Sequence, residues 1–437
     1  MALKRINIVE GKIGANTAGD SREFALITGG VAVVDKLALG KHYRIFRPSD
    51  ADALGITVAY DVANDVRIRR HIDEFYRIAG EGKKLNIMIV DQDDSKPADM
   101  IDAAKALVIA AGGNISDVVF AFNPVTGYSD TVVDGMNEDV MDALQPLQAF
   151  ADWANENDRP LHIVLEGRGL GETVASLPNL RNMTVGGSPE IPAVPAEGGN
   201  PEIPAVPAVP GVALSAHKIT VVVGQDWTYA DTLSTLGKKF ADVGTFLGCI
   251  AAQAWNRNPG EVETMNLQNA VKNSFMQGGL SNHKTYAEMY SSLETMDTKG
   301  YVFTIEDPGQ AGVWWNDGHV CAPIVVDADG NMNQHTIYYS HAFDMAKRAL
   351  RTALLPEIKK VKPLEGGKLP QGLISYYNGI GDMAFKDLAK KQLISEGVTI
   401  TDPDSDLLVD KVLNQQFSVI PTGCVNSIKG VLNLKSV

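Results

Sequence analysis

The C-terminal part of the chain has a regular pattern of apolar positions that predicts two helices. After Ser340, the expected N-cap, apolar side chains recur at helical spacing as far as Leu354, while basic side chains fall largely off that stripe. A second helix is expected after Asp382, with Gly397 as its stop. The pattern therefore predicts a helical pair before the chain turns to strands.

Alternating apolar and polar positions follow the helices and predict three strands, over residues 398–400, 417–420 and 424–434. The chain ends in the third of these, with no helix or charged tail after it. One face of this last strand carries Ile428, Gly430, Leu432 and Leu434, and the other carries Lys429, Val431, Asn433 and Lys435.

A short strand-like run also opens the chain, with Ile6, Ile8 and Val9 as its apolar residues. A terminal strand either pairs within its own domain or adds to the sheet of a neighbouring subunit. Each ladder hydrogen bond contributes roughly 1 kcal/mol net, so one added strand stabilises an assembly by a few kcal/mol. The pattern alone favours pairing within one chain and leaves pairing between subunits open.

Between the two ends, from about residue 56, strands alternate with helices. This order is typical of an α/β layer with a mainly parallel sheet, so the fold class is α/β, or α+β over the whole chain. Residues 301–326 are aromatic and β-like, with Trp314 and Trp315 in an expected turn. The expected strands of the layer cover 85–90, 118–122, 161–165 and 218–223, and its helices cover 67–79, 98–111, 138–155 and 231–254.

A proline-rich repeat interrupts this layer. The eight residues from Pro189, Pro-Glu-Ile-Pro-Ala-Val-Pro-Ala, recur from Pro201. Proline fixes φ and removes a donor, so the segment should be extended and polyproline-like. We interpret residues 187–211 as a surface insertion, with a ligand for a proline-binding domain as the alternative.

These patterns divide the chain into four parts. A strand arm and the β-rich start of a core are followed by the α/β domain, a mixed helical and β connection, and a C-terminal core domain that ends in the terminal strand. The parts cover residues 1–55, 56–255, 256–339 and 340–437.

Composition and charge limit the partners and the compartment that can be expected for this chain. The chain has 437 residues and a formal net charge of -14, with no long basic stripe, which argues against a nucleic-acid partner. Its three cysteines are widely spaced and indicate neither a disulfide framework nor a metal motif. No apolar run is long enough to span a bilayer, so no direct membrane insertion is expected. These features predict a cytoplasmic protein.

Enzyme motifs are weak. The glycines of Gly167-Arg-Gly-Leu-Gly follow a strand, but Glu172 stands where a dinucleotide fingerprint needs a third glycine. Asp317, His319 and Cys321 are interpreted as turn residues beside a packed strand, and not as a metal site. The aspartates at 402, 404 and 406 lack the glycine and glutamate of a calcium loop. We therefore expect no catalytic residue, cofactor or metal.

One acidic loop keeps an alternative function open. Asp91, Asp93 and Asp94 follow a strand end, where α/β enzymes often hold their sites. A solvated loop that caps the next helix is the simpler interpretation. The alternative function is a cytoplasmic α/β enzyme with its site near these three aspartates.

A set of short stretches, in order along most of the chain, forms a recognisable series. They are Leu54-Gly-Ile-Thr, His71-Ile-Asp-Glu-Phe-Tyr, Ala79-Gly-Glu-Gly, Leu85-Asn-Ile-Met-Ile, Leu247-Gly-Cys-Ile-Ala-Ala, Ala349-Leu-Arg-Thr-Ala-Leu-Leu-Pro-Glu-Ile, Gly367-Lys-Leu, Val398-Thr-Ile and Ile420-Pro-Thr-Gly. This series resembles the sheath-like proteins of phage-derived contractile systems, a family often described only as a domain of unknown function. The proline-rich insertion lies outside the resemblance.

The resemblance implies a non-enzymatic subunit that polymerises as stacked hexameric rings around an inner tube protein. Baseplate and terminal cap proteins are further implied partners, and a phage tail or tail-like particle is the implied destination. It also implies that terminal strands pair with neighbouring subunits. The residues expected at those contacts are Ile6, Ile8, Val9, Ile428, Val431, Leu432 and Leu434.

A basic helix face is the candidate surface toward the tube. The predicted helix after Asp382 exposes Lys386, Lys390 and Lys391, which would suit an acidic tube. A solvated helix face is the alternative.

Overall fold

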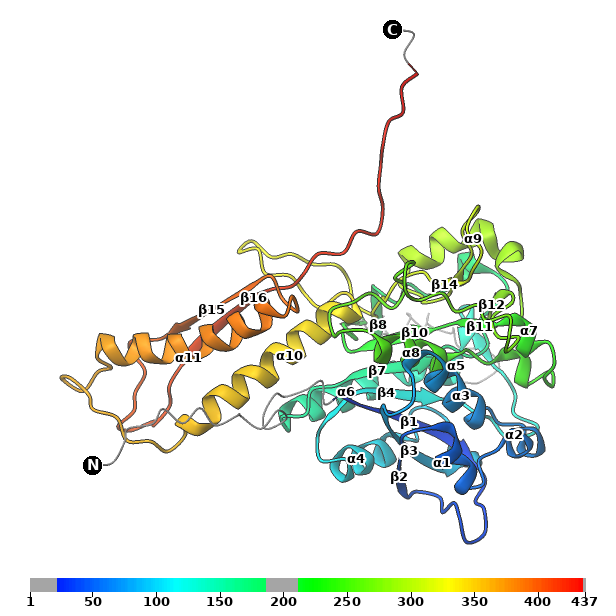
Figure 1. Ribbon diagram of the computed structural model, residues 1–437, viewed down its shortest axis with the longest axis horizontal. Coiled ribbons are helices and arrows are strands. Elements are labelled where there is room, and N and C mark those ends of the chain that lie inside the picture. Colours follow the sequence, from blue (N-terminus) through cyan, green and yellow to red (C-terminus); the bar gives the residue numbers. More distant parts are fainter. Residues whose placement is uncertain (1–21, 186–210, 435–437) are drawn as a thin grey trace, which may run out of the picture.

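The computed structural model describes residues 22–185 and 211–434. A body built on one sheet carries, on one side, a module of two long helices and a hairpin (Figure 1). The predicted strand at Ile6–Val9, most of the proline-rich insertion and Lys435 lie outside the described residues.

Six strands form the sheet of the body, and the prediction of a mainly parallel α/β layer is confirmed. The central strand, β1, is parallel to both of its neighbours, β3 and β4. Among the described strands of this sheet, only β2, at one edge, runs antiparallel to its neighbour. In spatial order the strands are β10 (Ile219–Val222), β7 (His162–Glu166), β4 (Ile115–Ala121), β1 (Glu23–Gly30), β3 (Lys84–Asp91) and β2 (His42–Ile45).

Helices cover both faces of this sheet. Apolar side chains of α4 and α6 form one core with one face, and those of α3 and α8 form a second core with the other. Because both faces are covered, the eight residues of β1 are all buried. The helices of the body are α1 (Pro48–Ala53), α2 (Val58–Asn64), α3 (Ile68–Ala79), α4 (Ile101–Ala110), α5 (Glu138–Asp142), α6 (Leu144–Glu156), α7 (Trp227–Ala230), α8 (Val243–Ala252) and α9 (Tyr286–Thr298).

The prediction of one long helix over residues 231–254 is wrong. The chain forms α7, a 3-10 turn at Gly237–Lys239 and then α8. The side-chain amide of Gln225 donates to the carbonyls of Lys238 and Phe240, at 3.1 and 2.7 Å. These buried bonds hold residues 238–240 out of the helical path, so tertiary contacts override the local apolar period.

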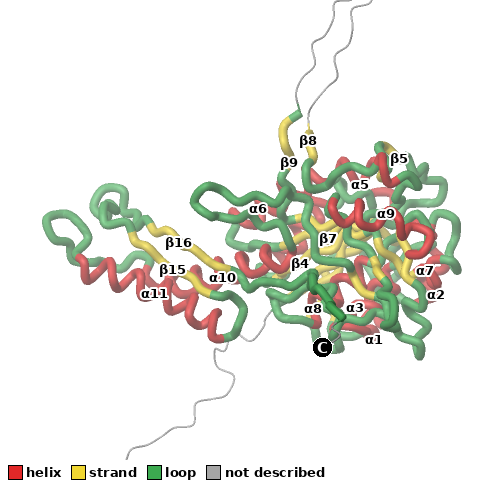
Figure 2. Tube along the Cα trace, turned by 90° about the horizontal axis from the view of Figure 1, so that it is seen from above, coloured by secondary structure: helices red, strands yellow, loops and turns green. Residues whose placement is uncertain are grey.

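The body also contains short pairs of antiparallel strands outside the main sheet. The β8–β9 pair stands out from it and flanks the undescribed residues 186–210 (Figure 2). Trp314 and Trp315 were expected in a turn, but they form a buried strand that pairs with β13. The pairs are β5 (Val132–Val133) with β6 (Met136–Asn137), β8 (Met183–Val185) with β9 (Val212–Leu214), β11 (Gly224–Asp226) with β12 (Gly278–Leu280), and β13 (Thr304–Ile305) with β14 (Trp314–Trp315).

The C-terminal module consists of α10 (Ile337–Leu354), α11 (Gln371–Lys390), β15 (Glu396–Thr401) and β16 (Gln415–Ile420). Both strands lie where the pattern predicted them, and they pair as an antiparallel hairpin. The two helices were predicted too short at their N-terminal ends. None of the helices in the described residues is long and apolar enough to cross a bilayer.

Both α10 and α11 start before the residues at which the sequence pattern placed their N-terminal ends. Thr336, not Ser340, caps α10, because its hydroxyl accepts from the Tyr339 amide. Ser340 lies inside the helix, where Lys218 donates to it at 2.9 Å. Asp382 lies in the middle of α11, and α11 ends at Lys390.

The expected boundary between residues 55 and 56 falls between strands of one sheet. β1 and β2 precede it and pair with β3, which follows it.

Candidate functional site

The carboxyl end of the parallel sheet, where α/β proteins often bind ligands, is filled by buried polar side chains. Asn123 accepts from the backbone amide and the guanidinium of Arg67, at 3.1 and 3.2 Å. Glu166 accepts from two backbone amides, and its burial raises its pKa to about 7. Arg168 pairs with Asp130 at 3.2 Å. Side chains that are already hydrogen-bonded within the protein therefore fill the carboxyl end of the sheet.

The acidic loop after β3 acts as a turn. The carboxylate of Asp91 accepts from the Asp93 amide at 3.1 Å, and Gln92–Asp94 form a 3-10 turn. Asp91, Asp93 and Asp94 are all exposed. Among the described residues, no group of three histidine, cysteine or acidic side chains is placed to hold a metal. The geometry gives the enzyme alternative no support at this loop.

The other weak motifs are also accounted for. Gly167 lies against Val221 and Val223, and the next helical element is only the 3-10 turn Val174–Ser176. His319 contacts Asp297 at 2.8 Å and Arg181 at 2.7 Å, which fixes both of its ring nitrogens. Contacts within the chain therefore account for both the glycine motif and His319.

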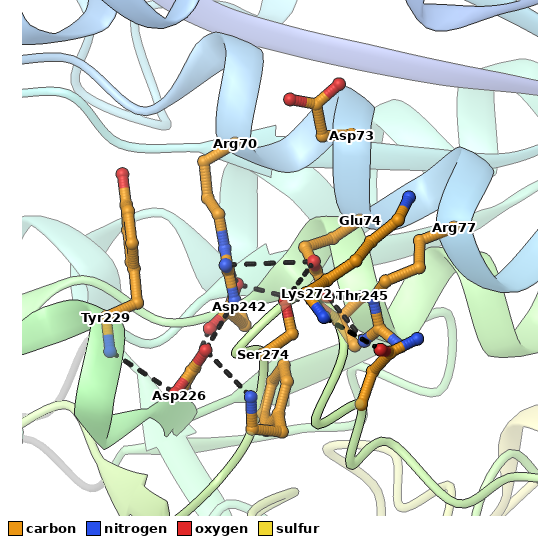
Figure 3. Close-up of polar contacts among 12 residues, drawn as sticks. Arg70, Asp73, Glu74, Arg77, Asp226, Tyr229, Asp242, Thr245, Lys272 and Ser274 are labelled. Atoms are coloured by element: carbon orange, nitrogen blue, oxygen red, sulfur yellow. Dashed lines mark hydrogen bonds and ion pairs between the residues drawn. The ribbon is translucent and has the colours of Figure 1, made fainter.

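A cavity of about 920 Å³ lies beside α2 and α3. At its inner wall Arg70 forms ion pairs with Asp226 and Asp242, at 3.1 and 3.2 Å, and lies 4.3 Å from the centre of the Tyr229 ring (Figure 3). Burial raises the pKa of Asp242 to about 6 despite Arg70. Glu74 is buried too, but Arg70 and Arg77 hold its pKa below its usual value.

This cluster joins distant parts of the chain. Asp226 accepts from the Tyr229 amide at the start of α7, and Asp242 precedes α8 and accepts from the Asp226 amide at 2.8 Å. Glu74 accepts from Ser274 at 2.9 Å. The charges are therefore paired across α3, α7, α8 and the loop near residue 274, which suits a structural cluster and not a reactive group.

The hairpin of the C-terminal module lies close against α11. Thr399 and Thr401 are buried beneath that helix, and two glycines permit the approach. A Cβ at Gly381 would lie 2.1 Å from the Thr399 hydroxyl, and one at Gly397 would lie 2.5 Å from the Phe385 ring. Gly397 is therefore not the helix stop that the sequence predicted, but a contact point inside β15.

One edge of the hairpin is already covered. The Asp402 amide donates to the Asn414 carbonyl at 2.9 Å, so with the hairpin's register the amides of Thr399 and Thr401 point away from β16. The Thr399 amide donates to Asp382 at 2.9 Å, and that of Thr401 donates to Asn378 at 2.8 Å. Side chains of α11 thus satisfy the outward amides of β15.

The other edge is open. By the same alternation, the amides of Phe417 and Val419 in β16 point away from β15. Within residues 22–185 and 211–434, neither amide has a hydrogen-bond acceptor. An unpaired strand edge of this kind is a template for another strand.

An apolar groove of about 390 Å³ runs beside this open edge. Phe417 lines it from β16, and Leu350, Leu354 and Leu355 line it from the end of α10. Pro160 closes it from the body, where Arg348 fixes the wall by donating to the Pro160 carbonyl at 2.6 Å. The groove therefore lies between the module and the body.

The C-terminal arm, residues 421–434, forms neither helix nor strand in the described structure. The strand predicted over 424–434 does not pair with any described strand. Its apolar side chains are almost fully exposed, with Ile428 at 90% and Leu432 at 97%. Figure 1 shows the arm leaving the hairpin and extending away from the molecule.

Side-chain bonds set the direction of the arm. Asn256 donates to the Thr422 hydroxyl at 2.8 Å, and Asn426 donates to Asp317 at 2.7 Å. These bonds hold the first residues of the arm on the surface of the body. The sequence pattern found the apolar alternation of the arm, but it gave no sign of these anchors.

The three lysines of the predicted basic face are exposed at the C-terminal end of α11. Lys390 lies 3.6 Å from Asp387, which is also exposed. Lys386 and Lys391 are exposed, whereas Phe385 and Leu388 on the same helix are buried.

Comparison with known proteins gives both a family and a fold. Residues 5–319 match the family model described as DUF2586, N-terminal domain. A search of curated proteins finds no match.

Two solved structures resemble the whole chain. One is a chain of the cryo-EM structure of the anti-feeding prophage (AFP) baseplate, with a TM-score of 0.56, 11% identity, and coverage of 100% of this chain and 99% of the other. The second comes from the PVC sheath complex of an extracellular contractile injection system in its contracted state. Its TM-score is 0.53 at 8% identity, over 100% of this chain and 98% of the other. The fold is therefore one found in contractile injection systems.

Proposed function

This chain belongs to the DUF2586 family, and we propose that it is the sheath subunit of a contractile phage tail or tail-like injection system. In this role it polymerises as stacked hexameric rings around an inner tube and shortens to drive the tube through a target envelope. The full-length likeness to a chain of the PVC sheath complex is the observation that carries the proposal.

The proposed role is mechanical and not enzymatic. The strongest enzyme candidate, the loop of Asp91, Asp93 and Asp94, caps its own turn. Contraction then draws on energy stored at assembly, as the lattice passes from an extended form to a shorter one with more buried interface.

We infer that both chain ends link the subunits. The exposed C-terminal arm would pair with a neighbouring subunit through Ile428, Val431, Leu432 and Leu434, and the N-terminal run through Ile6, Ile8 and Val9. Added strands gain roughly 1 kcal/mol per ladder hydrogen bond, which accumulates over a polymer with many identical contacts. The proposed partners are further copies of this chain, the inner tube, and the baseplate and cap proteins.

Negative-stain electron microscopy of the purified protein, alone and with its tube protein, tests the proposal. We expect hollow striated cylinders in at least the second sample. Uniform small particles in both samples would contradict a sheath. Assembly of the particle in the cytoplasm is part of the proposal and is checked by imaging thin sections of producing cells.

A further inference from the structure

We propose that the apolar groove between the module and the body receives a finger, residues 322–334, from the body of a second copy of this chain. This inference rests on the proposed function, since it names a contact between sheath subunits that uses neither end of the chain. The finger lies between Cys321 and the start of α10, and the groove lies at the other end of that helix.

The finger is an ordered loop. Its two legs are joined by an antiparallel bridge between Val326 and Met332. At its tip the Asp327 carboxylate accepts from the amides of Asp329 and Asn331, at 3.0 and 2.7 Å. Because these bonds fix the shape of the finger before it meets a partner, little conformational entropy is lost on binding.

One face of the finger is apolar and exposed. Val326 and Met332 lie opposite each other across the bridge, and Ile324 precedes Val326 by two residues, so all three share this face. The exposed fractions of Val326, Met332 and Ile324 are 62%, 41% and 61%. An exposed apolar face on an ordered loop is typical of a surface that meets another protein.

The groove offers a matching apolar surface. Leu354, Leu355 and Ile358 line it from the end of α10 and the turn that follows. Leu355 and Ile358 are 56% and 65% exposed, so this wall faces water in the single subunit. Contact between the finger and this wall removes apolar area of both partners from water, which is the main favourable term in association.

The tip of the finger is acidic. It carries Asp327 and Asp329, and no basic side chain occurs from residue 322 to residue 334. Asn331 donates to the Asp327 carboxylate at 2.8 Å and so holds the pKa of Asp327 below its usual value. The tip therefore keeps its negative charge, and it should bind beside basic groups.

The rim of the groove is basic. Among the described residues that line it, Lys347, Arg348 and Arg351 face a single acidic residue, Asp158. Arg351 and Asp158 form an ion pair at 2.7 Å, and both are about half exposed. Such a surface pair contributes little, so Arg351 can turn to an incoming carboxylate at small cost. The charges of the finger and of the rim are thus complementary.

The occupant must come from another copy because one chain holds its finger and its groove apart. The groove lies roughly 20–27 Å along α10 from the end of the helix that follows the finger, at about 1.5 Å per residue. Within residues 22–185 and 211–434, no residue of the finger lines the groove. The contact is therefore head-to-tail, and it can repeat from copy to copy as a helical assembly requires.

Sedimentation of the full-length protein tests the contact. The protein is spun at increasing concentrations, and the concentration above which assemblies pellet is measured. We expect Val326→Asp in the finger and Leu355→Asp in the groove each to raise that concentration roughly tenfold or more. The matched controls are Val34→Asp on the body and Val361→Asp beyond the groove, at exposed residues, and they should leave it unchanged.

A charge swap controls for folding. Asp329→Lys and Arg351→Glu should each raise the pelleting concentration, because each brings like charges together across the contact. Combined in one chain, the two changes restore opposite charges and should return the concentration to within about twofold of wild type. A folding defect caused by one change would not be repaired by the other, since the two residues lie on different elements.

The outcomes separate this inference from the proposed function. Wild-type cylinders, together with the same pelleting concentration for the finger, groove and control variants, would overturn the contact and uphold the sheath. Failure of the charge swap to restore assembly would also overturn the contact. Wild-type protein that builds no cylinders with its tube, but forms chains that Val326→Asp and Leu355→Asp break up, would uphold the contact and remove the sheath.

Discussion

The carboxylate of Asp382, in the middle of α11, accepts a hydrogen bond from the amide of Thr399 in β15 at 2.9 Å. This contact makes a helix side chain act as the missing neighbour of an edge strand. It is the reason that the two edges of the C-terminal hairpin are chemically different.

Removing that contact should loosen the hairpin. Asp382→Ala leaves the buried Thr399 amide without an acceptor, which costs about 1–3 kcal/mol. Thermal denaturation should show a lower midpoint, while Met383→Ala, an exposed neighbour on the same helix, should change little. Equal midpoints for the two variants would show that the contact does not stabilise the module.

Two glycines of α11 should respond in opposite ways to alanine. At Gly381 the new Cβ would meet Thr399 and force the hairpin away from the helix, so we expect a loss of stability. At Gly379 the space is open and the helix is regular, so we expect a gain of about 0.5–1 kcal/mol. Chemical denaturation of both variants checks the sign of each change.

Arg70 should be essential to the stability of the body. Arg70→Met would leave Asp226 and Asp242 buried without their shared counter-charge, at a cost of about 3–5 kcal/mol. Lys272→Met, at the exposed rim of the same cavity, is the control and should stay near wild type. Similar denaturation midpoints for the two variants would contradict the assignment of Arg70 as the centre of the cluster.

His71 should make stability depend on pH. Burial, with Arg67 and Arg70 nearby, lowers the pKa of His71 from 6.5 to about 3. Between these values the unfolded chain binds a proton that the folded chain does not, so stability falls as the pH drops below 6.5. This loss amounts to about 2 kcal/mol between pH 7.5 and pH 5.

His71→Asn should remove that part of the pH dependence, since asparagine does not titrate and its carbonyl replaces the ring nitrogen that accepts from the Gly244 amide. Free energies of unfolding at pH 7.5 and pH 5 give the measurement. If both proteins lose the same stability over this interval, His71 is not the source.

The basic face of α11 is tested by charge reversal. Lys390→Glu with Lys391→Glu should leave polymerisation intact but prevent assembly on the tube, because an acidic tube would be repelled. Lys36→Glu with Lys41→Glu, exposed on the body, controls for the change in net charge. Cosedimentation with tube protein is the assay, and unchanged assembly would contradict the proposal that this face meets the tube.

The sequence predicted the elements better than their contacts. Alternation located β15 and β16, because half-buried strands keep a two-residue period. The sequence pattern placed Gly397 at a helix stop. In the structure Gly397 is needed for its close contact with the Phe385 ring, which the pattern could not show. The start of α11 was missed for a related reason, since Asp382 serves the hairpin and not the helix cap.

The candidate site was only half visible in the same way. The apolar alternation of the arm around Leu432 can be found in the chain alone. The open edge of β16 cannot, because the outward direction of the Val419 amide depends on which side of β16 faces β15. The covered edge depends on Asn378 and Asp382, four residues apart on α11, a signal that has meaning only once the hairpin is in place.

β16 continues into the arm without any intervening element, from Ile420 to Pro421. If a neighbour's arm lies along β16, a subunit receives one strand and gives another from the same stretch of backbone. Tension applied along a row of such subunits would then pass from strand to strand without crossing the core of the body. The ladders would be loaded in shear, with all of their hydrogen bonds sharing the force, and the body would be free to turn while the row holds.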